Sequence, residues 1–211
     1  MLTLLLWMVV INIATAVNMS SVMFKDEALA KCIKNLSERN HWKNSEQVTK
    51  ITCHGKGIKN INGLAIFSQL KYLSLFNNAL TSVDLQPFKH LHYLNIANNK
   101  LTQIKLENLA ELNTLYLFKN KLTTIDFMGL SVLKKVRITN NLLQQLDLSP
   151  LISLEKAYFF DNKLKDLVVK DLPKLKFLEV RQNPMTDEVY DRYDELDGIT
   201  IVHDGNADDW K

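Results

Sequence analysis

The amino-acid sequence predicts an α/β repeat solenoid with a short helical cap at each end. Two observations lead to this fold class: an apolar pattern returns at a constant spacing along the middle of the chain, and segments with helical spacing flank it. The length of 211 residues suits one domain or one elongated array. The predicted parts are a signal peptide (1–16), an N-terminal helical cap (17–47), the repeats (48–185) and a C-terminal cap (186–211).

The first stretch, MLTLLLWMVVINIATAVN, has no charged side chain and contains an apolar run from Leu4 to Ile13. The run is short for a membrane span, and Ala14-Thr15-Ala16 has the small residues of a signal cleavage site. We therefore expect cleavage after Ala16, a secreted or periplasmic location, and no stable membrane span afterwards. Because no Lys or Arg precedes the apolar run, a start assigned too far downstream and a retained N-terminal anchor stay open as alternatives.

Residues 26–40, DEALAKCIKNLSERN, predict an amphipathic helix with Asp26 as its N-cap. A solenoid needs its terminal units covered, so the apolar face of this helix is expected to seal the first strand, with Trp42 as a further plug. That face carries apolar residues at i, i+3, i+4 and i+7, which are Leu29, Cys32, Ile33 and Leu36.

The chain has two cysteines, Cys32 and Cys53. An even pair in an exported chain predicts one disulfide, here closing a loop of twenty intervening residues and contributing about 3 kcal/mol in the chain-entropy model. The alternative is a pair of buried free thiols in a cytosolic protein. In the disulfide interpretation the bond ties the predicted helix to the first repeat.

Six consecutive copies of the pattern LxxLxLxxNxL begin at Leu70 and follow one another at steps of 21 residues. A degenerate copy begins 22 residues upstream at Val48, and a truncated copy begins at Leu196 in the same phase. One unit cannot bury its apolar positions alone, but stacked copies form a continuous core. The Asn at position 9 can satisfy backbone groups where each strand ends, so we expect a structural ladder of Asn78, Asn99, Asn120, Asn141, Asn162 and Asn183.

This pattern resembles the leucine-rich repeat family, in particular the short-repeat bacterial type to which the internalins belong. The resemblance covers residues 48–202, and the helix, cysteine, tryptophan and segment ITCHGKGIKNINGL of the N-terminal region are similar to the caps of exported bacterial members. It implies a curved right-handed superhelix, with a parallel β-sheet on the concave side and short turns or 3₁₀ segments on the convex side.

The segment TDEVYDRYDELDG predicts a short helix on the convex side, with Thr186 as its N-cap and acidic residues in its first turn. It should lead to a last strand over residues 199–202. The acidic residues also invite a calcium hypothesis. Their spacing does not match the calcium-loop pattern, however, so a solvated capping helix is the preferred interpretation.

The charge balance is modest but segregated along the chain. Lys and Arg number 26 against 23 Asp and Glu, a net charge of +3 that does not by itself argue for nucleic acid. Residues 187–211 hold nine acidic and two basic side chains, so the rest of the chain is basic. A basic body favours acidic partners or an anionic surface, and a solvated Lys-rich exterior is the plainer alternative.

No motif for catalysis is present, and the five histidines are scattered. We therefore predict a protein that is not an enzyme and has no cofactor and no metal site. Binding is the remaining class of function, and it requires a surface.

Strand alternation should send positions 3, 5 and 7 of each repeat to the concave face. Eight aromatic rings fall at these positions with basic residues among them. Exposed Tyr, Phe and Arg suit interfaces, so we predict that a protein or peptide binds there. The predicted partner-binding residues are Tyr72, Phe76, Tyr93, Tyr116, Phe118, Lys135, Arg137, Lys156, Tyr158, Phe160, Phe177 and Arg181.

Three alternatives concern the same face. The rings can serve mainly to pack on one another. A glycan or small polar ligand can stack on them, with Asn95, Arg137 and Glu179 as polar partners. The face can also hold a second copy of the chain.

Overall fold

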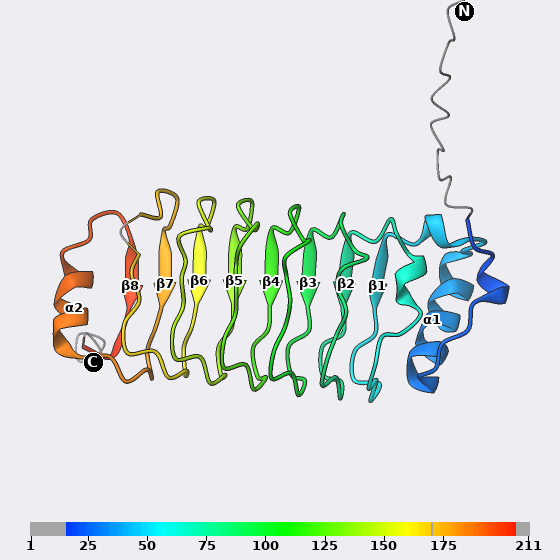
Figure 1. Cartoon of the computed structure of the whole chain (residues 1–211), viewed down its shortest axis with the longest axis horizontal. Coiled ribbons are helices and arrows are strands. Elements are labelled where there is room, and N and C mark those ends of the chain that lie inside the picture. The colour runs from blue at the N-terminus through cyan, green and yellow to red at the C-terminus, as the bar shows by residue number, and fades with distance from the viewer. Residues whose placement is uncertain (1–15, 170, 206–211) are drawn as a thin grey trace, which may run out of the picture.

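The computed structural model describes residues 16–169 and 171–205, which form one elongated array with a helix at each end (Figure 1). The predicted solenoid with helical caps is confirmed. The predicted signal peptide lies outside the described residues except for Ala16. In the described part, eight parallel strands lie side by side in sequence order: β1 (Lys50–Thr52), β2 (Tyr72–Ser74), β3 (Tyr93–Asn95), β4 (Thr114–Tyr116), β5 (Lys135–Arg137), β6 (Lys156–Tyr158), β7 (Phe177–Glu179) and β8 (Thr200–Val202).

The spacing of the repeats sets the register of the sheet. From β2 to β7 each residue pairs with the equivalent residue one repeat later, as Tyr72 does with Tyr93. The degenerate first copy joins the same ladder, because Lys50 of β1 pairs with Tyr72. The first step is 22 residues long, one more than the others, and the connection between β1 and β2 accommodates the extra residue without changing the strand register.

The last strand departs from the predicted phase. A step of 21 residues from Phe177 leads to Gly198, but the structure pairs Phe177 with Thr200, two residues later. The connection before β8 contains a helix and a turn in which Gly198 has a φ of +78°, a left-handed conformation that favours glycine. This route consumes two residues more than the extended connections of the earlier repeats. The expectation of a truncated copy in the same phase was wrong, although its strand lies where the sequence placed it.

The core runs through the array behind the sheet. In the third full repeat, for example, Leu112, Leu115, Leu117 and Leu122 are completely buried. Side chains on the opposite wall, such as Phe127, close the core from the connecting segments. Since equivalent residues stack from repeat to repeat, the core is continuous from one end of the array to the other.

The asparagine ladder ties neighbouring repeats together at the end of each strand. The Asn120 Oδ1 accepts a hydrogen bond of 3.0 Å from the Leu101 N–H of the preceding repeat. Its Nδ2 donates to the Ile96 carbonyl of the preceding repeat and the Leu117 carbonyl of its own, both at 3.0 Å. The side chain thus satisfies backbone groups that the turn removes from the sheet.

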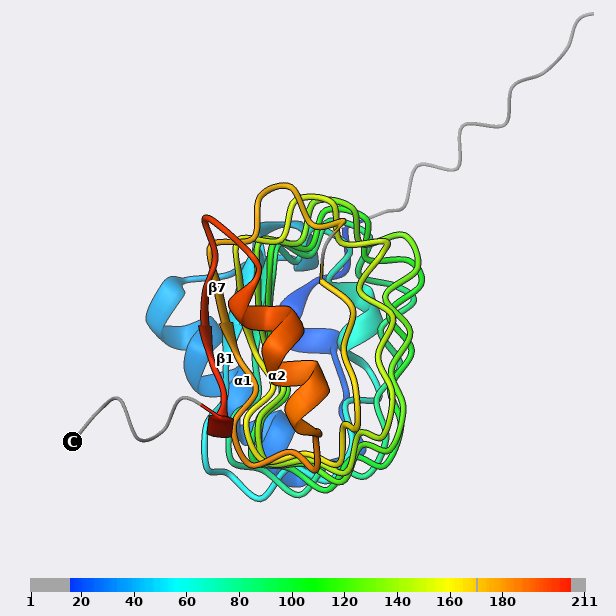
Figure 2. The same cartoon turned by 90° about the vertical axis from the view of Figure 1, so that its left-hand side faces the viewer.

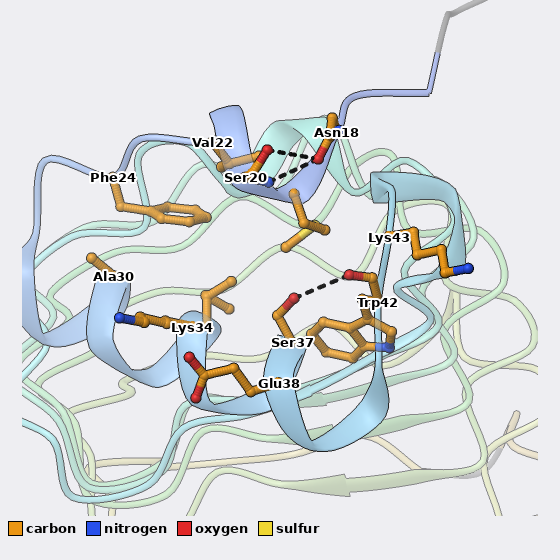
Figure 3. A pocket seen from close by; sticks show the side chains of 12 residues that line it. Asn18, Ser20, Val22, Phe24, Ala30, Lys34, Ser37, Glu38, Trp42 and Lys43 are labelled. Carbon is orange, nitrogen blue, oxygen red and sulfur yellow. Dashed lines mark hydrogen bonds between the residues drawn. The ribbon is translucent and has the colours of Figure 1, made fainter.

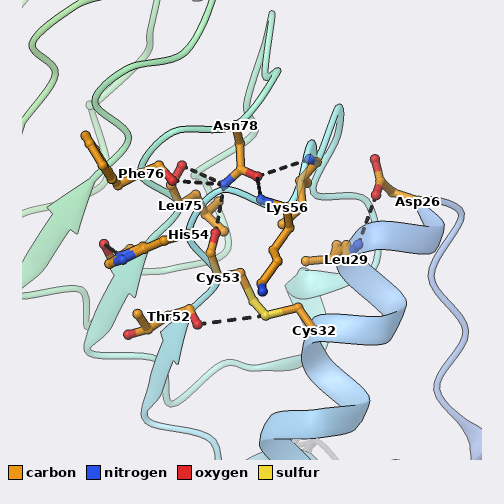
Figure 4. Close-up of a disulfide and its surroundings, with 12 residues drawn as sticks. Asp26, Leu29, Cys32, Thr52, Cys53, His54, Lys56, Leu75, Phe76 and Asn78 are labelled. Atoms are coloured by element: carbon orange, nitrogen blue, oxygen red, sulfur yellow. Dashed lines mark hydrogen bonds between the residues drawn. A yellow bond between two sulfur atoms is a disulfide. The ribbon is translucent and has the colours of Figure 1, made fainter.

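The N-terminal cap is built on α1 (Glu27–Asn40), flanked by the 3₁₀ turns η1 (Met19–Ser21) and η2 (Ser45–Gln47). Asp26 caps α1, since its Oδ1 accepts from the Leu29 N–H at 2.9 Å, and its Oδ2 accepts from the Lys59 N–H at 2.7 Å. A disulfide between Cys32 and Cys53 joins α1 to the residue that follows β1 (Figure 4). A third 3₁₀ turn, η3 (Leu64–Ile66), follows in the first repeat.

The C-terminal cap is α2 (Asp187–Asp194), which lies across the end of the array (Figure 2). Its buried residues are Val189, Tyr190 and Tyr193. The Tyr193 hydroxyl donates to the Leu167 carbonyl at 2.9 Å, so the helix is fixed to the preceding repeat by a hydrogen bond as well as by packing. Thr186 stands at the N-cap position but makes no side-chain cap hydrogen bond.

Candidate partner-binding surface

The predicted partner-binding residues lie on the side of the sheet that faces away from the core, which we call the sheet face. In each strand the central residue is buried and its neighbours point outward, as Thr114 and Tyr116 do on either side of Leu115. Position 7, two residues beyond the strand, continues the same face. The eight predicted aromatic side chains are all half-buried, so each ring has one side packed and another exposed.

The first row of rings is made of the tyrosines of β2, β3 and β4, and Lys50 of β1 lies at its start. Tyr72 and Tyr93 stack almost parallel, with ring centroids 4.0 Å apart, and Tyr116 meets Tyr93 edge-on at 5.6 Å. Lys50 Nζ lies 4.7 Å from the Tyr72 ring centroid, within cation–π range. Burial, followed by the neighbouring Tyr72 hydroxyl, raises the pKa of Tyr93 far above its usual value.

The second row of rings is built from position 7. Phe76 and Phe118 belong to repeats that are not adjacent, yet their ring centroids are 5.9 Å apart. The residue between them in the column is Ala97, which is completely buried, and its small size allows the two rings to meet. At the start of the row, His54 meets Phe76 edge-on at 5.8 Å, and burial lowers the pKa of His54.

Ser74 stands at position 5 of the first full repeat, one of the positions expected on the outward face, but it is not exposed. It is completely buried, and its Oγ lies 2.6 Å from His54 Nε2. The strand does direct Ser74 outward, but the larger His54 side chain from the preceding repeat reaches its hydroxyl. Direction along a strand and exposure are therefore separate properties on a face that carries large rings.

Basic side chains lie between the rings in the middle of the sheet face. Lys135 Nζ is 5.6 Å from the Tyr116 centroid and 5.9 Å from that of Tyr158. Arg137 Cζ is 5.0 Å from the Phe118 centroid and 6.0 Å from that of Tyr158. Together with Asn95, these residues line a hollow of about 280 Å³.

Both rows continue towards the C-terminal end of the array, where one cation of the face is paired with an acid. Tyr158 and Phe177 have ring centroids 5.1 Å apart, and Arg181 Cζ lies 5.9 Å from the Phe160 centroid. Arg181 also forms an ion pair with Glu179. Its charge is therefore compensated within the face, whereas Lys156 is exposed without such a partner among the described residues.

The sequence analysis missed Lys50 and His54 as members of the surface. Both occupy outward positions of the degenerate first copy, at positions 3 and 7 counted from Val48. Counting the outward positions from Val48 as well as from Leu70 would have found them. Their contacts with Tyr72 and Phe76 extend the sheet face by one strand.

Two much larger hollows lie elsewhere. One, of about 740 Å³, lies between α1 and the segment before it and has Phe24 and Trp42 in its wall, with Lys34 and Glu38 at its edge (Figure 3). The other, of about 770 Å³, contains Lys163, Lys165 and Asp166. Both mix charges of opposite sign, whereas the hollow on the sheet face is lined by cations and rings without an acid. We therefore regard the sheet face as the candidate site.

The side chains and helices of residues 16–169 and 171–205 also bear on metal binding and membrane insertion. In this part of the chain no group of three or more His, Cys, Asp or Glu side chains is placed to hold a metal ion. No helix in the same ranges is both long enough and apolar enough to cross a membrane.

The family model described as leucine rich repeats, in two copies, matches residues 68–111. This match covers two of the repeats, and the stacked strands give the whole array a leucine-rich repeat fold. Within that class its fold is internalin-like, as the sequence predicted. No curated protein sequence matches the chain.

Two solved structures from Listeria monocytogenes illustrate the likeness. Internalin C2 superposes with a TM-score of 0.62 at 24% identity, covering 89% of this chain and 97% of that one. The functional domain of InlJ, described as including a cysteine ladder, superposes with a TM-score of 0.50 at 20% identity, covering 77% of this chain. This chain spans about half of the InlJ domain, 52%. At these identities the comparisons define the fold alone.

Proposed function

We propose that this chain is a non-enzymatic binding module of an exported leucine-rich repeat protein, and that it engages a protein or peptide through the sheet face. One observation carries the proposal. Eight half-buried rings and several cations form a continuous strip across the strands, held in place by ring and cation–π contacts. Such a strip offers apolar area with little side-chain entropy left to lose when a partner binds.

The plainer interpretation, that the rings mainly pack on one another, accounts for the contacts but leaves part of each ring in water. A cluster that served only the fold would be covered more completely, since exposed aromatic area gains nothing for the free chain. The mutual packing instead preorganises the strip, which lowers the cost of binding.

Affinity capture from candidate partner sources tests this proposal. The bait is the described fold in three forms: the wild type, the double variant Phe118→Ala/Arg137→Glu, and the control Leu142→Ala/Lys121→Glu. The control makes the same kinds of change at exposed residues outside the strip. We expect a partner that the wild type and the control retain and the sheet-face variant loses. Identical partner lists for all three proteins would contradict the proposal.

Glycan binding on the same face is the second candidate, and the hollow lined by Tyr116, Tyr158 and Asn95 favours it. A sugar ring can stack on a tyrosine while polar side chains meet its hydroxyl groups. A glycan array read with the wild type and Tyr116→Ala separates the two functions. Strong array binding that the variant loses, with no protein captured, would replace the first proposal by the second.

Export is the cellular part of the proposal. The disulfide between Cys32 and Cys53 supports a secreted or periplasmic location, because such bonds persist in oxidising compartments. Expression of the full sequence followed by N-terminal sequencing of the exported protein tests it. A mature chain that begins at Val17 is expected, and an uncleaved chain retained with the membrane would favour the anchor instead.

A further inference from the structure

The cations of the sheet face lack carboxylate partners of their own. Lys50, Lys135, Arg137 and Lys156 form no ion pair with any residue in the part of the chain that the structure describes. Two acids from the same part of the array are engaged with other cations, Glu155 with Lys134 at 3.6 Å and Glu179 with Arg181. The middle of the face therefore carries uncompensated positive charge.

Two of these charges are immediate neighbours. Lys135 and Lys156 are register partners on β5 and β6, strands about 4.8 Å apart. Like charges placed opposite each other in a sheet destabilise it. The fold gains nothing from this arrangement in the free state, and a carboxylate placed between the two ammonium groups would relieve the repulsion.

Apart from Lys50 on β1, these unpaired cations lie in one half of the face. The outward residues of β2, β3 and β4 include Tyr72, Tyr93 and Tyr116 and carry no charge, whereas β5 and β6 present Lys135, Arg137 and Lys156. The hollow of about 280 Å³ lies at the boundary, where rings hold Lys135 and Arg137 in position. Its volume suits one or two side chains.

From this arrangement we infer that the partner presents an acidic and apolar peptide segment, with carboxylates against Lys135, Arg137 and Lys156 and apolar side chains against the tyrosines of β2 to β4. This inference rests on the proposed function and specifies the chemistry of its partner. The cations of β5 and β6 favour the acidic half of the partner segment by charge complementarity. The uncharged rings of β2 to β4 favour its apolar half.

A displayed library of random linear peptides, selected on the wild-type protein, tests the inference. Selected sequences should be enriched in Asp and Glu and in apolar residues, relative to the starting library. A selected peptide, labelled for anisotropy, should bind about tenfold more weakly to Lys156→Glu or Arg137→Glu and equally well to Lys121→Glu. Its affinity should also fall as salt is raised.

Lys156→Glu gives a second readout, because it separates binding from folding. The substitution places an acid beside Lys135, so the free variant should melt at the same temperature as the wild type or higher, while it loses the acidic peptide. A peptide with its acids replaced by lysines should bind Lys156→Glu better than it binds the wild type. A lower melting temperature with unchanged binding would overturn the inference.

The remaining outcomes distinguish the inference from the function on which it rests. Selected peptides without acidic enrichment, lost in Phe118→Ala but retained in Lys156→Glu, would overturn the acidic segment and leave the sheet face as the binding surface. Binding of an anionic polysaccharide such as heparin, with the same variant profile and no selected peptide, would replace the peptide by a glycan. Peptides that bind all the variants equally would overturn both.

Discussion

At the scale of single residues, position 8 of each repeat has a role in the backbone, because it lies where the chain turns at the end of the strand. Six consecutive repeats place this residue in the left-handed conformation, with φ between 54° and 58°. Asn occupies it at Asn77, Asn98 and Asn140, which fits the tolerance of Asn for this region. Lys119 has a φ of 55° and lacks that tolerance. These asparagines therefore allow the backbone to turn where each strand ends.

Lys119→Asn should therefore stabilise the protein by about 0.5–1 kcal/mol, because it removes part of the cost of a left-handed Lys. Chemical denaturation measures the difference. Lys100→Asn, two positions further along the preceding repeat where φ is negative, is the matched control and should change little. Equal effects of the two substitutions would show that surface charge, not backbone conformation, is responsible.

Asp26 gives the pH dependence of the N-terminal cap. Burial alone would raise the pKa of Asp26, but hydrogen bonds from the backbone N–H groups of Leu29, Lys59 and Asn60 outweigh it and lower the pKa. A lowered pKa in the folded state means that the stabilisation is complete above the unfolded value of about 3.9 and is lost as the pH falls through the folded value.

Asp26→Asn should therefore be less stable than the wild type at neutral pH, by about 1 kcal/mol or more. The gap should narrow as the pH falls below about 4, because the unfolded carboxylate then becomes protonated while the folded carboxylate, with its lowered pKa, stays ionised to a lower pH. Urea denaturation at neutral and acidic pH measures the gap, with the exposed Glu38→Gln as the control on the same helix. A gap that is constant across this range would mean that the carboxylate charge is not what matters.

At the scale of elements, the strand and its closing asparagine act as one unit. Each ladder asparagine forms hydrogen bonds with backbone groups of its own repeat and of the preceding one. The ladder therefore joins neighbouring repeats whose strands are already paired in the sheet. The strands, their register and this ladder were all predictable, because each depends on a residue type recurring at a fixed position. The phase of β8 was not predictable from the repeat. Here α2 replaces the usual connection between strands, so the number of residues between β7 and β8 depends on a helix and a turn.

Asn120→Ala should destabilise the protein by about 2 kcal/mol or more. The variant leaves the buried Leu101 N–H without its partner, and it removes one of the hydrogen bonds that the Ile96 and Leu117 carbonyls accept from ladder asparagines. Thermal or chemical denaturation measures the loss. Asn113→Ala, a half-buried asparagine of the same repeat that lies outside the ladder, should cost much less, and similar losses at the two sites would contradict the role of the ladder.

At the scale of the whole molecule, the array is a chain of nearest-neighbour contacts closed by two different ends. The disulfide and Asp26 secure the first end, while α2 secures the second through packing and the Tyr193 hydrogen bond. The sequence placed both caps and predicted that the twelve partner-binding side chains share a face. The hollow and the burial of Ser74 could not be predicted from the sequence, because they depend on the packing of large neighbouring side chains.

Tyr193→Ala should open the array from its C-terminal end. Truncating this buried ring should cost about 3–5 kcal/mol locally, and hydrogen-exchange mass spectrometry should show lost protection in β8 and β7 while β2 to β4 stay protected. Tyr72→Ala removes the same atoms from the sheet face at the other end of the array, and it should leave the protection of β7 and β8 unchanged. Uniform loss along the whole array would instead indicate a single cooperative unit.

The buried Ala97 beneath Phe76 and Phe118 has a consequence for how such a protein can change in length. Large and small residues alternate down that column, from Phe76, Ala97 and Phe118 to Thr139 and Phe160. Deleting or duplicating one repeat would preserve the fold but bring two large residues, or two small ones, side by side. The recombination unit that preserves the surface is therefore a pair of repeats, although the unit that preserves the fold is one.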